Sequence, residues 1–373
     1  MNPIESHIPR IGTPPDATRI SPALTAVSVT AAAPVLRARI RQRPEDFVVE
    51  ELSSATPEGE GEHVWILLRK SGCNTDHAAR CLARAAGVPR SAVGYAGLKD
   101  RHAVTTQWFS VQMPGREAPD WASVLGSELE VLRSERHGRK LKTGFLDGNR
   151  FRLTLRECRG DPAMLEQRLD CIRRTGVPNY FGPQRFGRDG GNLVKARALF
   201  EGRLRVRDKT LRGLYLSAAR SALFNRLLAH RVEQGTWCRV LPGDVLNLDG
   251  SRSHFLAETV DATLEQRVLD QDVHPTGALW GAGEPETRGD IAILEQTIAD
   301  EDPQFAQGLV AAGLKQERRP LRLPVRALTH RWIDPATLEL SFELPPGGYA
   351  TTVLAEVAEV VDDSGPAGGG EMA

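Results

Sequence analysis

One acidic residue, Asp100, lies in a short loop between two strand-like segments, among side chains that can carry positive charge. The loop runs from Gly94 to Ala103, and Lys99, Arg101 and His102 flank the carboxylate. A carboxylate beside cations stays ionised, and the cations can hold phosphate while the carboxylate does chemistry. A charged turn whose aspartate caps backbone amides would have the same composition. The loop alone therefore indicates a candidate catalytic carboxylate without deciding its role.

Other catalytic patterns are missing from the sequence. There is no G-x-x-x-x-G-K-[ST] motif, which argues against a phosphate-cradling NTPase, and no serine lies in a G-x-S-x-G elbow. His63 and His77 are too far apart for an H-E-x-x-H metal site, and Asp189 follows Arg188 in a Gly-rich loop without metal partners. One carboxylate without a metal or an organic cofactor leaves covalent or acid–base chemistry.

The composition narrows the class of protein. The 373 residues are 40% hydrophobic and 26% charged, which is typical of a soluble globular protein with a sizeable core. No apolar run approaches the roughly 18 residues that a membrane helix needs. The five cysteines form no C-x-x-C pair, which argues against a disulfide framework and a structural zinc site. We therefore expect no membrane partner, no metal and a reducing, cytoplasmic compartment.

Charge is balanced in total but segregated along the chain. Lys and Arg number 48, as do Asp and Glu. Arg133–Arg159 holds nine basic and three acidic residues (+6), and Arg203–Arg226 holds seven basic and one acidic residue (+6). Leu256–Ala306 holds twelve acidic and two basic residues (−10). Such segregation permits basic faces for a polyanion on a neutral protein, although ordinary solvated faces would look the same.

The pattern of elements predicts an α+β domain interrupted by a helical insertion. Residues 1–33 are rich in proline without periodicity, and we expect them to be disordered. Asn74 or Thr75 can cap a helix that ends before Gly87, and Gly176 can end another. The remaining expected elements are strands at 46–50, 64–68, 93–98, 108–112, 151–155 and 337–344, and helices at 162–175, 193–200, 218–234 and 351–360.

Several blocks of the sequence closely resemble the tRNA pseudouridine synthase D (TruD) family, in the same order. The loop block Ala96–Gln107 resembles the family's catalytic motif. The block Val177–Gly187 resembles its middle, and the Gly/aromatic part Asn179–Gly187 is the most specific match. The resemblance extends roughly from Leu36 to Val361. Its other blocks are Pro44–Glu50, Gly61–His63, Gly72–Thr75, Gly148–Phe151, Ser217–Asn225 and Gly348–Thr351.

The resemblance implies a pseudouridine synthase catalytic domain, a mixed sheet flanked by helices, with a family-specific inserted α+β domain. We place the catalytic domain at 34–175 plus 324–361 and the insertion at 176–323, with a loose C-terminal tail at 362–373. RNA would lie in the cleft between the two domains. The implied partner is tRNA, with no protein partner, and we expect a monomer.

The implied activity is the isomerisation of uridine 13 in the D-arm of tRNA, with tRNA-Glu the usual target, to pseudouridine. This reaction rejoins the base through carbon and needs neither cofactor nor metal, but it needs a carboxylate that attacks or deprotonates near C1′. By resemblance Asp100 is that carboxylate. The residues expected to bind substrate are Phe47, Asn149, Phe151, Tyr349, Lys99 and Arg41, the last as a cation partner of Asp100.

Two residues depart from the family pattern. Tyr349 stands where Phe is more usual, so its hydroxyl needs a partner. Ala355 stands where relatives often carry a cation. Phe47 and Phe151 alternate with apolar residues and could serve the core alone, just as Asn149 could be a turn former.

Two alternatives to this activity stay open. One is a non-catalytic RNA-binding or tRNA-folding protein on the same fold, and the other is the same chemistry on other RNAs.

Overall fold

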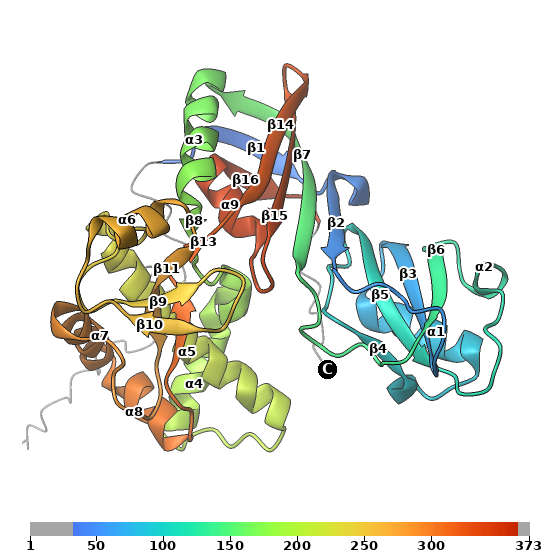
Figure 1. Cartoon of the computed structure of the whole chain (residues 1–373), viewed down its shortest axis with the longest axis horizontal. Coiled ribbons are helices and arrows are strands. Elements are labelled where there is room, and N and C mark those ends of the chain that lie inside the picture. The colour runs from blue at the N-terminus through green and yellow to red at the C-terminus, as the bar shows by residue number, and fades with distance from the viewer. Residues whose placement is uncertain (1–32, 365–373) are drawn as a thin grey trace, which may run out of the picture.

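The computed structural model describes residues 33–364, and their main feature is a ten-stranded mixed sheet. The central order is β14-β15-β7-β2-β5-β3-β6, with β1 and β16 joined through β7 and with β4 beside β5 (Figure 1). The strands are β1 (Leu36–Ile40), β2 (Phe47–Leu52), β3 (His63–Ser71), β4 (Val93–Tyr95), β5 (Val104–Gln112), β6 (Leu129–His137), β7 (Gly148–Gly160), β14 (Arg326–Asp334), β15 (Thr337–Leu344) and β16 (Ala358–Asp362).

One end of the sheet, strands β3, β5 and β6, packs against helix α1 (Thr75–Ala86). The Asn74 side chain accepts the His77 N–H at 2.7 Å and so caps the helix. Gly87 ends it with φ 60°, a left-handed conformation that glycine adopts without strain. The predicted start and end of this helix are confirmed. A short helix, α2 (Trp121–Val124), precedes β6.

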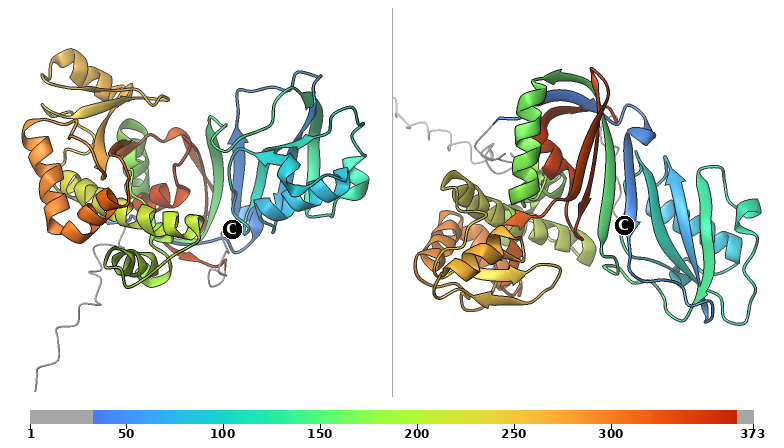
Figure 2. Two further views of the ribbon diagram at one scale, coloured as in Figure 1. Left: turned by 90° about the horizontal axis from the view of Figure 1, so that it is seen from below. Right: turned by 45° about the horizontal axis from the view of Figure 1, so that its top comes forward.

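The 13-residue strand β7 connects the two halves of the sheet, because it pairs with β15, β2 and β1. Helices α3 (Pro162–Thr175) and α9 (Ala350–Val357) share one hydrophobic core with these strands. In Figure 2, β7 and β2 stand between the α1 side of the molecule and the side that holds α4 and α5.

Residues 179–321 build a second unit with two hydrophobic clusters of its own. The chain enters and leaves this unit through a two-stranded sheet of β8 (Val177–Pro178) and β13 (Arg322–Leu323). Its helices are α4 (Gly191–Phe200), α5 (Lys209–Glu233), α6 (Ala262–Leu269), α7 (Gly289–Glu301) and α8 (Pro303–Ala311), and its strands are β9 (Val245–Leu248), β10 (His254–Leu256), β11 (Val273–Leu279) and β12 (Glu317–Pro320).

Two predicted elements are wrong at their ends. The strand expected at 93–98 stops at Tyr95, where the chain turns into the Asp100 loop. The helix expected at 351–360 stops at Val357, and 358–362 form β16. The reason is tertiary, because β16 pairs in parallel with β1 and so gains backbone hydrogen bonds that a longer helix would forgo.

The predicted tail at 362–373 is wrong at its start. Asp362 is paired with Arg41, and the Asp363 carboxylate binds the Arg39 guanidinium, with 2.8 Å between Nε and Oδ2. Residues 365–373, and residues 1–32 of the tail expected at the N-terminus, lie outside the described residues. Within residues 33–364, no helix has the length and apolar character to span a bilayer.

Candidate active site

Several of the predicted site residues share one face of the central strands. In the antiparallel pair of β2 and β7, Asn149 lies opposite Glu51 and Phe151 lies opposite Val49. Phe47 is two residues before Val49 on β2. Because side chains alternate along a strand, these residues all point to the same side of the sheet. The structure therefore brings together Phe47, Asn149 and Phe151 from segments about 100 residues apart.

The Asp100 loop is held in place by a buried lysine beneath it. Lys70 at the end of β3 is fully buried, and its Nζ donates to the carbonyl oxygens of Asp100 (2.9 Å) and Cys73 (2.6 Å). Burial lowers the pKa of Lys70 to about 8. A buried cation with two carbonyl acceptors fixes the backbone of the loop directly below the residue that carries the candidate carboxylate.

Two further buried side chains fix the start of the loop. The Thr75 hydroxyl, in the first turn of α1, accepts the Lys99 backbone N–H at 2.9 Å and donates to Gln107 Oε1 at 3.1 Å. Gln107 on β5 then donates through Nε2 to the Gly97 carbonyl at 3.0 Å. Helix α1 and strand β5 thus meet under the loop and restrict its conformations.

The Asp100 carboxylate is accessible and paired with Arg41, the residue expected as its cation partner. The Asp100 side chain is 60% exposed, and its Oδ2 accepts from Arg41 Nη2 at 3.0 Å. The same guanidinium donates to Asp362 at 2.6 Å and lies 4.0 Å above the centre of the Phe47 ring. Arg41 adopts φ 56°, a strained conformation for a residue with a side chain, which these three contacts offset.

The second carboxylate at Arg41 belongs to Asp362, the last residue of β16. Burial by itself would raise the pKa of Asp362, but hydrogen bonds from Ser364 and the charge of Arg41 outweigh it, and the pKa lies below its usual value. Arg41 is therefore held between two carboxylates, that of Asp362 (38% exposed) and that of Asp100 (60% exposed).

Lys99 is placed differently from the phosphate contact that its position in the motif suggests. Its Nζ lies 2.8 Å from Glu51 Oε2, and the two side chains are only 5% and 1% exposed. Glu51 Oε1 also accepts the Trp108 backbone N–H at 3.3 Å. A buried, paired ammonium fixes the loop to β2, so the geometry gives Lys99 a positioning role next to Asp100 in place of a contact with solvent-exposed phosphate.

The two phenylalanines are buried, and the asparagine keeps a free acceptor. The Phe151 ring stacks on Phe342 at 5.5 Å between centroids and meets Phe47 edge to face at 6.3 Å. Both Phe47 and Phe151 belong to the main core. Asn149 Oδ1 is buried without a hydrogen-bond partner among the described residues. A buried acceptor without a donor costs free energy unless a ligand supplies one.

The hydroxyl of Tyr349, which departs from the family pattern, has a partner. Arg185 Nη2 donates to Tyr349 Oη at 3.1 Å, and Arg185 Nη1 donates to Ser217 Oγ at 3.1 Å. Nearby, the Arg319 guanidinium lies 4.0 Å over the Phe181 ring, and burial lowers the pKa of Arg319 to about 10. Tyr349 thus connects the N-terminus of α9 to the unit of residues 179–321.

The other positions singled out in the sequence, Arg101, His102 and Ala355, make fewer contacts around Asp100. Arg101 and His102 are exposed, and Arg101 makes a long hydrogen bond of 3.4 Å to the Gly72 carbonyl. Ala355 lies half-buried on α9. The cation beside Asp100 comes from Arg41, upstream of β2.

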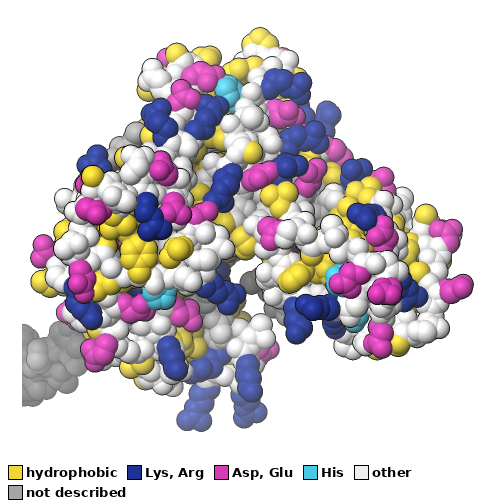
Figure 3. Space-filling model, viewed as in Figure 1, with side chains coloured by type: hydrophobic (Ala, Val, Ile, Leu, Met, Phe, Trp, Pro, Cys, Tyr) yellow, Lys and Arg dark blue, Asp and Glu magenta, His cyan; other side chains and the backbone are white. Residues whose placement is uncertain are grey.

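The two basic segments are partly used inside the protein. In Arg133–Arg159, Arg156 pairs with buried Asp46 and Arg150 with Glu343. Among the described residues, Arg139, Lys142, Arg152 and Arg159 are exposed without an ion pair, as are Arg205, Arg207 and Lys209 on the approach to α5. Figure 3 shows Lys and Arg side chains on both sides of the hollow at the lower middle of the face drawn.

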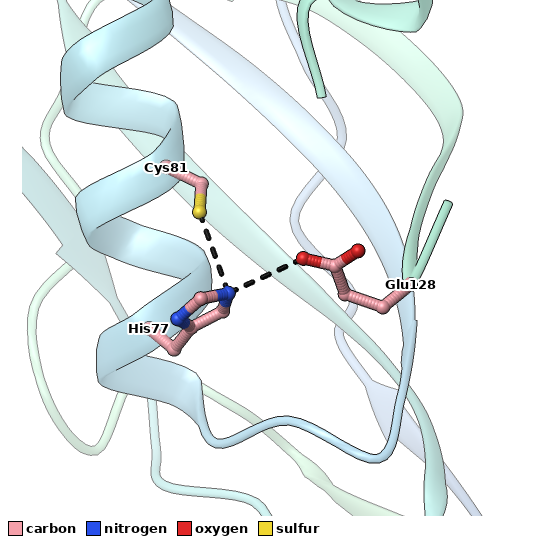
Figure 4. A group of neighbouring side chains, drawn as sticks. All are labelled: His77, Cys81 and Glu128. Atoms are coloured by element: carbon pink, nitrogen blue, oxygen red, sulfur yellow. Dashed lines mark hydrogen bonds and ion pairs between the residues drawn. The ribbon is translucent and has the colours of Figure 1, made fainter. Parts of the chain in front are cut away.

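One group in the described chain has the composition of a metal site. His77 and Cys81, one turn apart on α1, and Glu128 before β6 have ligand atoms within 4.8 Å of one another (Figure 4). His77 Nε2 lies 3.3 Å from Glu128 Oε1 and 3.5 Å from Cys81 Sγ, so the three side chains satisfy one another. The i, i+4 spacing was visible in the sequence, but Glu128 could not be placed beside it.

Sequence reasoning missed four residues of the site: Lys70, Glu51, Asp362 and Arg185. Only Lys70 carried a signal, because it shares the two-residue period of the apolar positions Val64, Ile66 and Leu68 and so had to point inward. The other three reach the site through pairings between distant segments.

Comparison with known proteins gives the same family as the sequence blocks. The family model described as tRNA pseudouridine synthase D (TruD) matches residues 28–196 and 190–357. The chain is 52% identical over 338 residues to a tRNA pseudouridine synthase D of Nitrosococcus oceani, covering 89% of this chain and 93% of that one. It is 49% identical over 346 residues to that of Xanthomonas axonopodis, covering 88% and 94%.

A solved structure shares the fold. The putative tRNA pseudouridine synthase D of Methanosarcina mazei superposes with a TM-score of 0.71 at 23% identity, over 89% of this chain and 96% of that one. The predicted α+β class with a large mixed sheet is confirmed at this level. Because the family model matches most of the chain and about half of the aligned residues are identical to those of these relatives, the chain belongs to the tRNA pseudouridine synthase D (TruD) family.

Proposed function

We propose that this chain converts uridine 13 in the D-arm of tRNA, with tRNA-Glu the usual target, to pseudouridine, and that the Asp100 carboxylate performs the chemistry. The observation that carries the proposal is the state of that carboxylate. It is exposed and paired with Arg41, on a loop whose backbone Lys70, Thr75 and Gln107 fix from below. A fixed loop with an accessible carboxylate is pre-organised to meet a substrate.

The reaction needs little beyond this group. The bond from N1 of uracil to C1′ breaks, the base turns, and C5 forms a new bond to C1′ while C5 loses a proton and N1 gains one. No electron acceptor and no transferred group are involved, so the atoms balance within the nucleoside. Asp100 either attacks the sugar at C1′ or removes a proton beside it, and Arg41 keeps the carboxylate oriented in both routes.

The surroundings of Asp100 suit a flipped-out base. Asn149 Oδ1, the buried acceptor without a partner, can receive an N–H from the uracil edge. The Tyr349 ring offers a face for the base and its hydroxyl is already bound to Arg185. Phe47 and Phe151 support this surface from the core, and Lys99 positions the loop through Glu51.

The domain division supports a cleft for RNA. The clusters of buried residues separate the sheet and its helices from residues 179–321, in line with a catalytic domain at 34–175 plus 324–361 and an insertion at 176–323. Exposed cations lie on the α5 side and on the loop before β7. A monomer, a cytoplasmic location and independence from cofactors stay predictions.

The test compares Asp100→Asn with a matched control, Asp189→Asn. Asp189 is also a loop aspartate next to an arginine, but it is fully exposed, away from the contacts of Asp100. We expect Asp100→Asn to lower pseudouridine formation in a tRNA transcript at least about 1000-fold, the scale seen when a nucleophile is removed. RNA affinity should stay within about threefold, because phosphate contacts dominate it.

Two results would contradict the proposal. Turnover by Asp100→Asn near that of Asp189→Asn would remove Asp100 from the chemistry. A wild-type chain that binds and refolds tRNA without forming pseudouridine would support the non-catalytic alternative instead.

A further inference from the structure

A concave site separate from the Asp100 site lies beside the loop that leads into β7. It is a cavity of about 730 Å³ whose inner wall is aromatic. Trp65 and His137 stack with ring centroids 4.0 Å apart and planes 16° from parallel. The Phe145 ring meets the Trp65 ring edge to face at 6.3 Å. Trp65 is 1% exposed, whereas Phe145 is 52% exposed, so one large ring remains open to solvent above a buried pair.

The wall of this cavity is held rigidly. Trp65 Nε1 donates to the Arg139 carbonyl at 2.7 Å, and the Leu141 N–H donates to Ser110 Oγ at 2.9 Å. The Gly144 N–H donates to the carbonyl of Ala96, the first residue of the Asp100 loop block, at 2.7 Å. The segment that leads to Phe145 is therefore fixed at Arg139, Leu141 and Gly144 before any ligand arrives.

The rim of the cavity is positive. Arg139, Lys140 and Lys142 line it and are exposed, and Arg139 and Lys142 have no ion pair within the described part of the chain. The one carboxylate in the lining, Glu58, already accepts the Gly138 N–H at 3.2 Å and lies 3.5 Å from His137. Three cations around one half-exposed ring match a nucleotide, whose base stacks on aromatic side chains while its phosphates bind Lys and Arg.

We propose that this pocket binds an unstacked nucleotide of the RNA substrate other than the target uridine, with the base on Phe145 and the adjoining phosphates at Arg139 and Lys142. The proposal rests on the proposed function, because the ligand is the same RNA. Phe145 is four residues before Asn149, which is at most about 14 Å of extended chain. The RNA therefore reaches both sites at the start of β7.

The pocket is distinct from the Asp100 site. Trp65 and Lys70 are five positions apart on β3, an odd number, and side chains alternate between the two sides of a strand. Trp65 therefore faces the opposite side of the sheet from Lys70, the lysine beneath the Asp100 loop. The RNA must then pass around the end of β2 and β7, and the pocket holds a nucleotide that flanks the target or one from a neighbouring loop.

The first test uses the full-length chain and an unmodified tRNA transcript, with Phe145→Ala, Phe145→Trp and the control Leu132→Ala. Leu132 is another exposed apolar residue, on β6, outside the cavity. Removing one base–aromatic stack should weaken RNA binding roughly 5- to 150-fold. Phe145→Trp keeps an aromatic face at this position and should bind RNA about as tightly as the wild type.

Salt dependence separates stacking from charge. Phe145→Ala should leave the slope of log affinity against log salt unchanged. Arg139→Gln with Lys142→Gln should lower that slope by roughly 0.7 for each single-strand phosphate that the protein no longer neutralises. A scan of transcripts that each carry one abasic site then identifies the nucleotide bound in the pocket. An abasic site at that position should weaken RNA binding by the wild type, but it should not weaken binding by Phe145→Ala any further, because the stack is already lost in this variant.

Several outcomes would overturn the pocket. The first is an RNA affinity of Phe145→Ala equal to that of Leu132→Ala. The second is an equal loss of affinity in the wild type and in Phe145→Ala at every abasic position. The third is a loss of affinity that follows a lowered melting temperature and that Phe145→Trp shows as well. These outcomes are separate from the proposed function, which is tested by pseudouridine formation in the same transcript by the wild type and by Asp100→Asn.

Discussion

The buried pair of Lys99 and Glu51 allows a quantitative test of how the catalytic loop is held. The change is Glu51→Gln, because glutamine keeps the shape of the side chain and the oxygen that accepts the Trp108 N–H, and removes only the charge. Lys99, with a side chain 5% exposed, is then left as a buried cation without its carboxylate 2.8 Å away.

The expected loss of stability in Glu51→Gln is large. Removing one partner of a buried ion pair costs about 3–5 kcal/mol of the free energy of unfolding. An upper bound comes from the alternative that the lysine loses its proton. Deprotonating an ordinary lysine with a pKa near 10.4 costs about 5 kcal/mol at pH 7 and about 2 kcal/mol at pH 9. The penalty of Glu51→Gln should therefore shrink as the pH rises, which no change in packing alone would produce.

The assay is urea unfolding at pH 7 and pH 9, followed by tryptophan fluorescence, since Trp65 and Trp108 lie on the neighbouring strands. The matched control is Glu130→Gln, which breaks the pair with Arg69 on the same sheet. Those side chains are 60% and 48% exposed, so less than about 1 kcal/mol should be lost.

Lys99 itself supplies the decisive comparison. Lys99→Met combined with Glu51→Leu should recover most of the stability, because an apolar pair of similar volume replaces a buried ion pair at little cost. The reasoning is refuted if Glu51→Gln is as mild as Glu130→Gln and Lys99→Met instead lowers the salt slope of tRNA binding. That result would make Lys99 the phosphate contact that its place in the motif suggested.

Three further outcomes follow from the site. Tyr349→Phe removes the 3.1 Å bond from Arg185 and should lower kcat/KM by about 2- to 10-fold in steady-state kinetics, and an unchanged value would mean that the bond does not support the site. The pKa of Lys70 is about 8 in the folded chain and 10.5 in the unfolded chain, so between pH 8 and pH 10.5 the unfolded chain binds more protons than the folded one. The free energy of unfolding should rise with pH by up to about 1.4 kcal/mol per unit there, measured as the difference from Lys70→Met. Reversing the charges of Arg205 and Arg207 should lower the slope of log tRNA affinity against log salt by up to about two in filter binding. An unchanged slope would mean that these cations face away from RNA.

Local signals in the sequence were sufficient for the bounds of helix α1 and for the identity of the Asp100 loop. The cap at Asn74 and the glycine at 87 gave the bounds of α1, and the motif gave Asp100 with Arg41 upstream of it. These depend on neighbouring residues, whose effects do not require the rest of the fold. The period of apolar residues after Thr351 also indicated a helix, correctly as far as Val357.

What the sequence could not show is which distant side chains meet. Glu51 reaches Lys99 only because β2 and β5 pair in parallel, and residues 358–362 form a strand only because β1 offers its edge. Arg220 and Arg226 counted toward a basic segment, yet Arg220 binds the Leu279 and Trp280 carbonyls and Arg226 pairs with Asp302. Charge along the chain therefore overstated the charge available to RNA.

The pairing of β1 with β16 has a consequence for the order in which the protein can be made. Arg41 is synthesised early, but its partner Asp362 ends the last described strand, and about 200 residues separate the end of β7 from it. At bacterial or eukaryotic elongation rates this takes roughly 10–40 s. During that time a nascent chain carries the Asp100 loop without the strand that completes the surroundings of Arg41. Assembly of the site thus requires synthesis beyond Asp362, and products of translation that stop before β16 should lack it.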